Sequence, residues 1–262
     1  MTITAKIICD SVAAHGGRIT TMELIYPRFI HSELMTHRKF SRNSASSRAI
    51  PIERMIQAVV DNPAMPIHWG RNQPGMQAKH SEVDTDTARE LWLDARDRAV
   101  DSATELNELG LHKQVVNRVL EPFMHMTTLV TSTEWDNFFS QRISKEAQPE
   151  INALAIAMKT AMDDSVPKFA KLHVPYILEV ERDSIYTQKS LIALSVARCC
   201  RVSYLKHGSS TTNDVQDMIR YNELLRLGHW SPFEHVAIAA DNAQRPSGNF
   251  TGWLQHREEV DK

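Results

Sequence analysis

A group of cationic and hydroxyl side chains lies between residues 34 and 52, a stretch that contains no carboxylate. Its cations are His37, Arg38, Lys39, Arg42 and Arg48, and between them stand one asparagine and four serines: Asn43, Ser41, Ser44, Ser46 and Ser47. Arginine forms bidentate, charge-assisted hydrogen bonds to phosphate oxygens, and short hydroxyls and amides satisfy the lone pairs that remain. These residue types at close spacing predict a site for a phosphorylated ligand.

Three other interpretations of the same stretch are a solvated basic face, a flexible serine-rich linker and a nucleic-acid patch. The linker is disfavoured because apolar residues on both sides, in PRFIHSELM and AIPIERMI, favour burial. A nucleic-acid patch is disfavoured because the formal net charge of the chain is −2 and no second run combines basic with aromatic residues. A phosphorylated small molecule is therefore the preferred ligand.

Composition sets the broad class of the protein. The chain has 262 residues, of which 42% are hydrophobic and 24% charged, which is typical of a globular protein; we expect one domain over residues 1–262. No apolar run approaches the roughly 20 residues that cross a bilayer, and no signal peptide is indicated. Three cysteines, Cys9, Cys199 and Cys200, fit free thiols in a cytoplasmic protein. Without an HExxH or paired CxxC motif, no metal site is predicted.

The elements that would position these side chains follow from the hydrophobic pattern. Strands are expected over 3–12 and 18–26, with a turn at His15-Gly16-Gly17, and a short helix from Phe29 to about Phe40. His37 falls on the apolar stripe of that helix, a position that also suits a structural core histidine. Further helices are expected at 50–61, 86–109 (capped by Thr85 or Asp86 and closed by Gly110), 111–122, 148–163, 190–199 and 213–227, with a loop at 62–83 and a strand-like VPYILEV.

These elements predict an α+β fold, in which a small antiparallel sheet from residues near 3–26 and 232–240 packs with several long helices. A doubly wound sheet is disfavoured because the expected strands lie at the two ends of the chain.

Two arginines are expected on apolar helix faces. Arg118 lies with a stripe formed by Leu111, Val115, Val119 and Pro122, and Arg142 follows Phe138 by four residues. A guanidinium is rarely buried without a counter-charge. Either a carboxylate such as Glu121 or Glu150 pairs with these arginines, or they face an anionic ligand.

Together, the segments of this chain resemble the motifs of the flavin-dependent thymidylate synthases. The signature of that family runs Arg-His-Arg, two residues, Ser, one residue, Asn-Glu, one residue, Ser, one residue, Arg-Tyr. The same spacing here reads Thr36, His37, Arg38, Ser41, Asn43, Ser44, Ser46, Arg48 and Ala49. Other matching positions are Pro27, Glu33 (a glutamine in the family), Asn137, Arg142, Ala147-Gln148-x-Glu150, Arg201-Val202-Ser203-Tyr204 and Gly228-His229-x-Ser231-Pro232-Phe233-Glu234-His235.

The motif order differs from that of the family. The RVSY and GHxSPFEH motifs precede the signature there and follow it here, so the chain resembles a circularly permuted core, with 62–109 and a tail at 241–262 as additions. Permutation is tolerated when the original termini lie close together. Departures within the signature are Thr36 for arginine, Ser44 for glutamate and Ala49 for tyrosine.

The resemblance implies C5 methylation of dUMP to dTMP, with methylenetetrahydrofolate as carbon donor, FAD as hydride carrier and NADPH as its reductant, in a homotetramer whose sites lie between subunits. It implies nucleotide contacts from Glu33, Ser44, Ser46, Arg48, Arg118 and Arg142. It implies flavin contacts from Thr36, His37, Arg38, Asn137, Ser203, His229 and Ser231, with Arg142 and His229 catalytic. Two alternatives stay open: methylation or hydroxymethylation of dUMP or dCMP on the same scaffold, and a non-enzymatic nucleotide- or nucleic-acid-binding protein.

Overall fold

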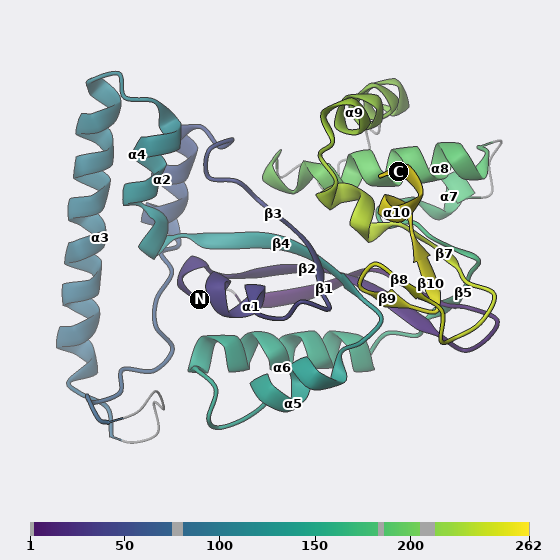
Figure 1. Ribbon diagram of the computed structural model, residues 1–262. Coiled ribbons are helices and arrows are strands. Elements are labelled where there is room, and N and C mark those ends of the chain that lie inside the picture. The colour runs from purple at the N-terminus through teal and green to yellow at the C-terminus, as the bar shows by residue number, and fades with distance from the viewer. Residues whose placement is uncertain (1–2, 75–80, 183–185, 205–212, 262) are drawn as a thin grey trace.

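A five-stranded sheet forms the centre of the computed structural model, which describes residues 3–74, 81–182, 186–204 and 213–261 (Figure 1). Its order is β3-β4-β2-β1-β5, and all neighbours are antiparallel except the short parallel pair of β1 with β5. The strands are β1 (Thr4–Val12), β2 (Arg18–Pro27), β3 (Ser41–Ser44), β4 (His125–Ser132) and β5 (Lys168–Phe169). The predicted hairpin of β1 and β2 is confirmed, with Gly16 in its turn at φ +84°.

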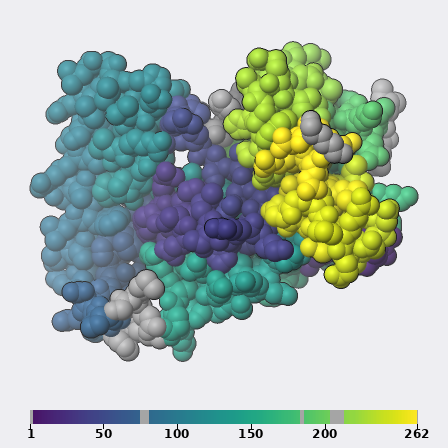
Figure 2. Space-filling view, in the orientation of Figure 1, coloured from purple at the N-terminus to yellow at the C-terminus, as the bar shows by residue number. Residues whose placement is uncertain are grey.

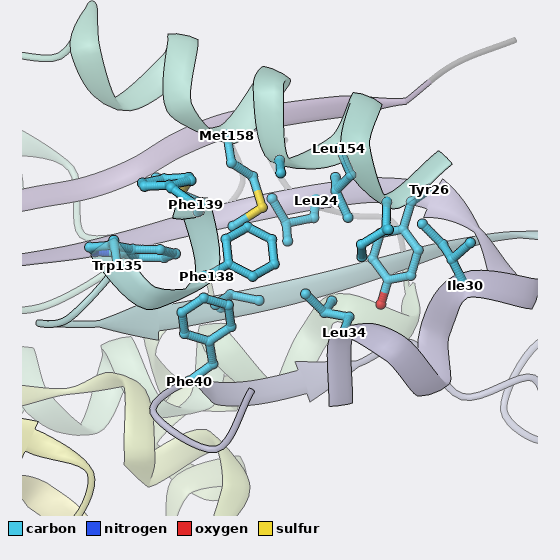
Figure 3. Packing of buried hydrophobic residues seen from close by; sticks show 14 of the residues in the cluster. Leu24, Tyr26, Ile30, Leu34, Phe40, Trp135, Phe138, Phe139, Leu154 and Met158 are labelled. Atoms are coloured by element: carbon cyan, nitrogen blue, oxygen red, sulfur yellow. The ribbon is translucent and has the colours of Figure 1, made fainter. Parts of the chain in front are cut away.

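One face of this sheet is covered by α1 (His31–Met35), α5 (Asp136–Arg142) and α6 (Pro149–Asp163). Alternate residues of β2 and β4, including Leu24 and Val130, point to this face. Figure 3 shows Leu24 close to Phe138 and Met158 of the two helices. Phe40 meets the ring of Phe138 edge to face, with ring centroids 5.1 Å apart. This core fixes α5 beside the turn that follows α1.

The opposite face carries the C-terminal half of the chain. It consists of α7 (Glu179–Arg182), α8 (Gln188–Cys199), α9 (Asp214–Leu227) and α10 (His256–Val260), two 3-10 segments at 200–204 and 231–235, and two small sheets. The three-stranded sheet has the order β10-β7-β6, and the other pairs β8 with β9. Their bounds are β6 (Leu172–His173), β7 (Ala237–Ala239), β8 (Pro246–Ser247), β9 (Phe250–Thr251) and β10 (Trp253–Gln255).

Three further helices lie at one end of the sheet: α2 (Ile52–Asp61), α3 (Thr85–Glu108) and α4 (Lys113–Val119). They share a small core around Val59, Ala103 and Leu120. Figure 2 shows them on one side of the molecule and the green and yellow C-terminal half on the other, with the purple residues of β1–β3 between. The region 62–109 therefore belongs to a helical unit that borders the signature segment. No helix in the described ranges is long and apolar enough to cross a membrane.

The mixed α+β class is confirmed, but two strand predictions are wrong and one strand is missing from the prediction. β4, which lies between β3 and β2, is the missing strand, because both of its faces are buried and its threonines interrupt the apolar alternation. The strand expected at 232–240 shrinks to β7 and pairs with β6 and β10 instead of β1 and β2. VPYILEV is not a strand, since a turn with Tyr176 at φ 62° interrupts it.

Helices at 50–61, 148–163, 190–199 and 213–227 are confirmed to within two residues, and Gly228 ends α9 in the left-handed conformation. α3 starts one residue early, with Asp84 as its cap. The helix expected to reach Phe40 ends at Met35, because the chain turns there toward β3. The expected loop lies in part at 75–80, outside the described residues.

The helix predicted from Leu111 has a different buried face. α4 buries Val116, Asn117 and Leu120 against α2 and α3, while Leu111 and Val115 are 39% and 47% exposed. The predicted stripe is therefore wrong by one position, and Arg118 lies on the solvent side. The segment 241–262, expected as an added tail, contributes fully buried Trp253 to a core with Ile19 of β2.

A buried polar chain joins the two halves across the sheet. His173 of β6 contacts Ser11 and Thr21 at 2.9 and 2.8 Å; Thr21 contacts Thr131 at 2.7 Å, and Thr131 contacts His235 at 2.8 Å. Both histidines are fully buried, and burial lowers the pKa of each to about 3. They are therefore neutral hydrogen-bonding groups at physiological pH.

The two buried histidines of this polar network predict that the folded protein loses stability in acid. An unfolded histidine takes up a proton near pH 6.5 while the folded one does not until about pH 3, so stability is present above pH 6.5 and is lost as the pH falls toward 3. Between pH 7 and pH 5 the free energy of unfolding should fall by about 2 kcal/mol for each histidine. Urea unfolding at both pH values measures it. In H173Q and H235Q the pH dependence should be smaller; an unchanged slope would contradict the assignment.

Candidate functional site

A cleft of about 830 Å³ opens between the turn that follows α1 and the start of α5. The turn is held by hydrogen bonds from Thr36 to the carbonyl of Glu33 and from Arg42 to the carbonyl of Met35, at 2.7 and 2.6 Å. Cations, carboxylates and aromatic rings all line the cleft; its lining includes Arg18, Thr36, His37, Arg38, Lys39, Phe40, Glu134, Trp135, Asp136, Asn137, Phe138, Lys159 and Asp163. Four predicted flavin residues, Thr36, His37, Arg38 and Asn137, therefore share one cleft.

Arg142 lies beside this cleft, at the end of α5. Its Nε–H donates to Nε2 of His37 at 3.0 Å, and its Nη2 donates to the hydroxyl of Thr36 at 3.3 Å. The edge of the His37 ring also meets Phe138, with ring centroids 4.8 Å apart. Burial, and then the charges of Arg142 and Arg42, lower the pKa of His37. His37 is therefore a neutral acceptor that orients Arg142.

No carboxylate forms an ion pair with Arg142 among the described residues, and the Glu150 expected as a partner binds elsewhere. The Glu150 carboxylate accepts from the backbone N–H of Ile67 at 2.7 Å and from Gln148 at 3.0 Å. Glu33 is half-buried; burial raises its pKa, and the charge of Arg142 opposes this shift. Arg142 thus contacts a neutral ring and lies near the carboxylate of Glu33.

The signature strand β3 contacts the two motifs from the other end of the chain. The side-chain amide of Asn43 donates to the carbonyl of Cys199 at 2.7 Å, and the hydroxyl of Ser231 donates to Oδ1 of Asn43 at 3.3 Å. Ser44, on the opposite face, contacts Thr128 of β4 at 2.9 Å. Segments separated by more than 150 residues therefore meet at β3, as the permuted order requires. The side chain of Ser203 lies outside the described residues.

Residues 45–50 form a loop clamped by α4. The amide of Asn117 donates to the carbonyls of Ser47 and Ile50 at 2.7 and 3.0 Å, and Lys113 donates to the carbonyl of Ala49 at 3.2 Å. Arg48 is exposed on this loop and has no side-chain partner within the described part of the chain. The loop is rigid where Arg48 attaches, and its guanidinium points outward.

Arg118 pairs with a carboxylate, which is the first of the two alternatives that the sequence offered for it. Its guanidinium donates to Glu121 at 2.6 Å, and the same carboxylate accepts from Ser47 and from Arg28, at 3.1 and 3.2 Å. Half of the Arg118 side chain is exposed, so an anion can still approach it. In this structure, however, Arg118 pairs with Glu121, and the same carboxylate accepts a hydrogen bond from Ser47 of the loop.

The predicted site residues thus form separate groups in one chain. Arg142 contacts His37, in the turn that precedes β3 and borders the cleft. Ser44 is the last residue of β3, and Ser46 and Arg48 follow it in the loop. Ser231 lies against β3, and His229 is exposed just before it. The sequence did not reveal the roles of Asn117 and Asn152. Asn117 holds the loop that carries Arg48, and Asn152 holds the end of α5 at Arg142. Their signal was a polar residue on or near the buried side of an amphipathic helix.

Comparisons with known proteins identify the family of the chain. A family model described as "Thymidylate synthase complementing protein" matches residues 14–168. The chain belongs to this family, the flavin-dependent thymidylate synthases. The matched range includes the signature and α5–α6. The motifs at 201–204 and 228–235 lie outside this range in the sequence, but their segments contact β3 in the fold.

The fold also resembles solved structures. A UMP/dUMP methylase, PolB from Streptomyces cacaoi bound with 5-Br dUMP, superposes with a TM-score of 0.50 at 15% identity, over 62% of this chain and 90% of that one. The same enzyme bound with 5-Br UMP gives a TM-score of 0.47 at 17% identity, over 62% and 88%. No curated protein matches the sequence. At this identity the likeness supports the shared fold.

The Arg142–His37 contact predicts a shift in the titration of His37. In R142Q the adjacent positive charge disappears, so the pKa of His37 should rise toward its ordinary value of about 6.5 while burial still holds it below. NMR titration of the His37 ring measures this shift. The control is R98Q, on the far exposed surface of α3. An unchanged His37 pKa in R142Q would show that Arg142 does not contact the ring in solution.

Proposed function

We propose that this protein is a flavin-dependent nucleotide methyltransferase that converts dUMP to dTMP, with methylenetetrahydrofolate as carbon donor and NADPH as reductant. The observation that carries the proposal is the gathering of Thr36, His37, Arg38 and Asn137, from two separate segments, around one cleft next to Arg142. Family membership gives the reaction class, and the nucleotide named for the PolB structure supports the substrate. A cytoplasmic location accords with these substrates.

The cleft suits FAD in size and in chemistry. Its volume of about 830 Å³ lies within the range of cofactor sites. The largely buried rings of Phe40, Trp135 and Phe138 form part of its wall and would give a ring system a limited apolar surface. Arg38 would offer charge for a pyrophosphate, whereas Lys39 and Lys159 also line the cleft but pair there with Glu134 and Asp163, at 2.9 and 2.5 Å. When bound, the reduced flavin supplies the hydride that completes the new methyl group.

The residues of this chain would bind and polarise the nucleotide. Arg142, oriented by neutral His37, would donate hydrogen bonds to a pyrimidine carbonyl and stabilise negative charge that develops on its oxygen. Ser44, Ser46 and Arg48, with Arg118, would hold the phosphate through hydroxyl and guanidinium donors. His229 and Ser231 would contact the flavin from the C-terminal side of β3.

An assembly of several copies would join the separate groups. Arg48 and His229 are exposed in the single chain, and the rigid loop of Arg48 presents its guanidinium outward. A second copy that carries its own Arg142 cleft to this surface would place phosphate and flavin contacts side by side. We therefore propose a homo-oligomer, a tetramer in line with the family, as the active form.

Absorbance and turnover test the proposal directly. Purified protein should bind FAD, show a flavin spectrum that changes on addition of dUMP, and form dTMP from dUMP, methylenetetrahydrofolate and NADPH. R142A should reduce turnover by at least about 100-fold, because one preorganised donor to the developing charge is lost, with little change in Tm. R98A is the matched control. A protein that cannot take up FAD, and binds nucleic acid in a steeply salt-dependent way, would instead be a binding protein.

Glu33 favours cytosine as a second candidate base. The carboxylate is half-buried near Arg142; burial raises its pKa, and the charge of Arg142 opposes this shift. An ionised carboxylate accepts a hydrogen bond from the amino group of cytosine but repels the carbonyl oxygen of uracil at the same position. dCMP is therefore the alternative substrate, with a methyl or hydroxymethyl product.

The E33Q variant separates the two bases. If Glu33 reads the base, E33Q should weaken binding of dCMP about tenfold and strengthen binding of dUMP, because glutamine can donate to a carbonyl. Calorimetric titration of both nucleotides measures the difference, and the product mass distinguishes methyl from hydroxymethyl. Equal affinities before and after the substitution would exclude Glu33 as the residue that selects the base.

A further inference from the structure

Two asparagines hold the backbone next to two arginines of the proposed site in the same way. Each donates both hydrogen bonds of its side-chain amide nitrogen to two backbone carbonyls of one short segment. Asn117 holds the loop that carries Arg48, and Asn152 holds the end of α5 that carries Arg142. Only donors can satisfy carbonyl oxygens, so the orientation of both amides follows from their partners.

Asn117 is fully buried in α4. Its Nδ2 donates to the carbonyls of Ser47 and Ile50, at 2.7 and 3.0 Å, and so bridges the residues on either side of Arg48 and Ala49. The backbone bond from Ala49 to Ser46, at 3.0 Å, closes the same turn. The Cα of Arg48 is therefore held from both sides, although its side chain is exposed.

Asn152, on the first turns of α6, performs the same task for Arg142. Its Nδ2 donates to the carbonyl of Arg142 itself at 2.8 Å and to that of Ser144 at 3.2 Å. The last carbonyls of a helix lack partners within the helix, so this amide satisfies two acceptors where α5 ends. It also fixes the direction in which Arg142 leaves the helix toward His37.

We infer that Asn117 and Asn152 are positioning residues that set the geometry of Arg48 and Arg142, respectively. The inference rests on the proposed function, because it assigns these arginines to nucleotide phosphate and pyrimidine. An arginine side chain is long and flexible, so its guanidinium is placed accurately only when the backbone that carries it is fixed. A displacement of about 1 Å near the reacting groups costs a large share of the rate.

The two asparagines should affect different kinetic constants. Arg48 contacts the phosphate, which is bound equally in the ground state and the transition state, so loss of Asn117 should raise KM and leave kcat nearly unchanged. Arg142 stabilises charge that develops during the reaction, so loss of Asn152 should lower kcat. A purely structural role would instead reduce the amount of folded enzyme, which lowers the apparent kcat of both variants and leaves KM unchanged, so kcat is calculated per flavin-loaded enzyme.

The experiment compares N117A, N117S and N152A with V59A in the flavin-loaded enzyme. Val59 lies in the same helical core as Val116 of α4, and its side chain cannot form a hydrogen bond to the loop, so V59A is the control for a loss of stability. We expect KM for dUMP to rise about tenfold in N117A, the equivalent of one lost charge-assisted bond, with binding of deoxyuridine, which lacks the phosphate, unchanged. N152A should lower kcat about tenfold with a similar dissociation constant for dUMP. N117S, smaller in its effect on packing, replaces N117A if that variant does not fold.

Equal loss of dUMP and deoxyuridine binding in both N117A and N117S, or an unchanged kcat in N152A, would overturn the inference while the wild-type enzyme still turns over dUMP. Failure of the wild-type protein to bind or convert any pyrimidine nucleotide would instead overturn the proposed function, and the inference with it. Tm values equal to that of V59A, together with the split between KM and kcat, support the positioning role.

Discussion

The pairing of β3 with β4 is the contact on which the site region depends. Its antiparallel register, from Ser41 opposite Thr131 to Ser44 opposite Thr128, sets which side of the sheet each signature residue faces. Because side chains alternate along a strand, Asn43 reaches the C-terminal half and Ser44 reaches the face of α1, α5 and α6. A shift of one residue would exchange these faces and separate the signature from Cys199 and Ser231.

Arg198 and Arg142 have opposite electrostatic surroundings. Arg198 is 4% exposed and is neutralised by Glu181 at 2.7 Å and Asp217 at 3.1 Å, an arrangement that only joins α7, α8 and α9. Arg142 is paired with a neutral imidazole and a hydroxyl instead. Its charge is therefore oriented but not cancelled, which is what a site for an anionic or polarised ligand requires and what a structural pair lacks.

Much of the fold and of the cleft could be predicted from the sequence, because amphipathic helices such as α6 and the β1–β2 hairpin follow local periodicity. β4 could not, since its buried threonines are satisfied by Thr21, Tyr26 and His235 on other segments. The buried face of α4 could not either, because two stripes one position apart were both apolar and only packing on α2 and α3 selects between them. The Arg118 and Glu121 pair was among the stated alternatives; the role of Asn117 in holding a loop depends on contacts distant in sequence.

The length of β3 limits what a single chain can bind. At roughly 3.3 Å per residue, its four residues separate the turn of His37 from the loop of Arg48 by on the order of 10 Å or more. One pyrimidine ring cannot bridge that distance, whereas a nucleotide stacked beside a larger ring system, or a nucleotide shared between two copies, can. The loop of Arg48 is clamped by Asn117 and Lys113 and cannot fold back toward the cleft without losing those bonds. The rigidity of this loop therefore favours completion of the site by a second ligand or a second subunit over closure within one chain.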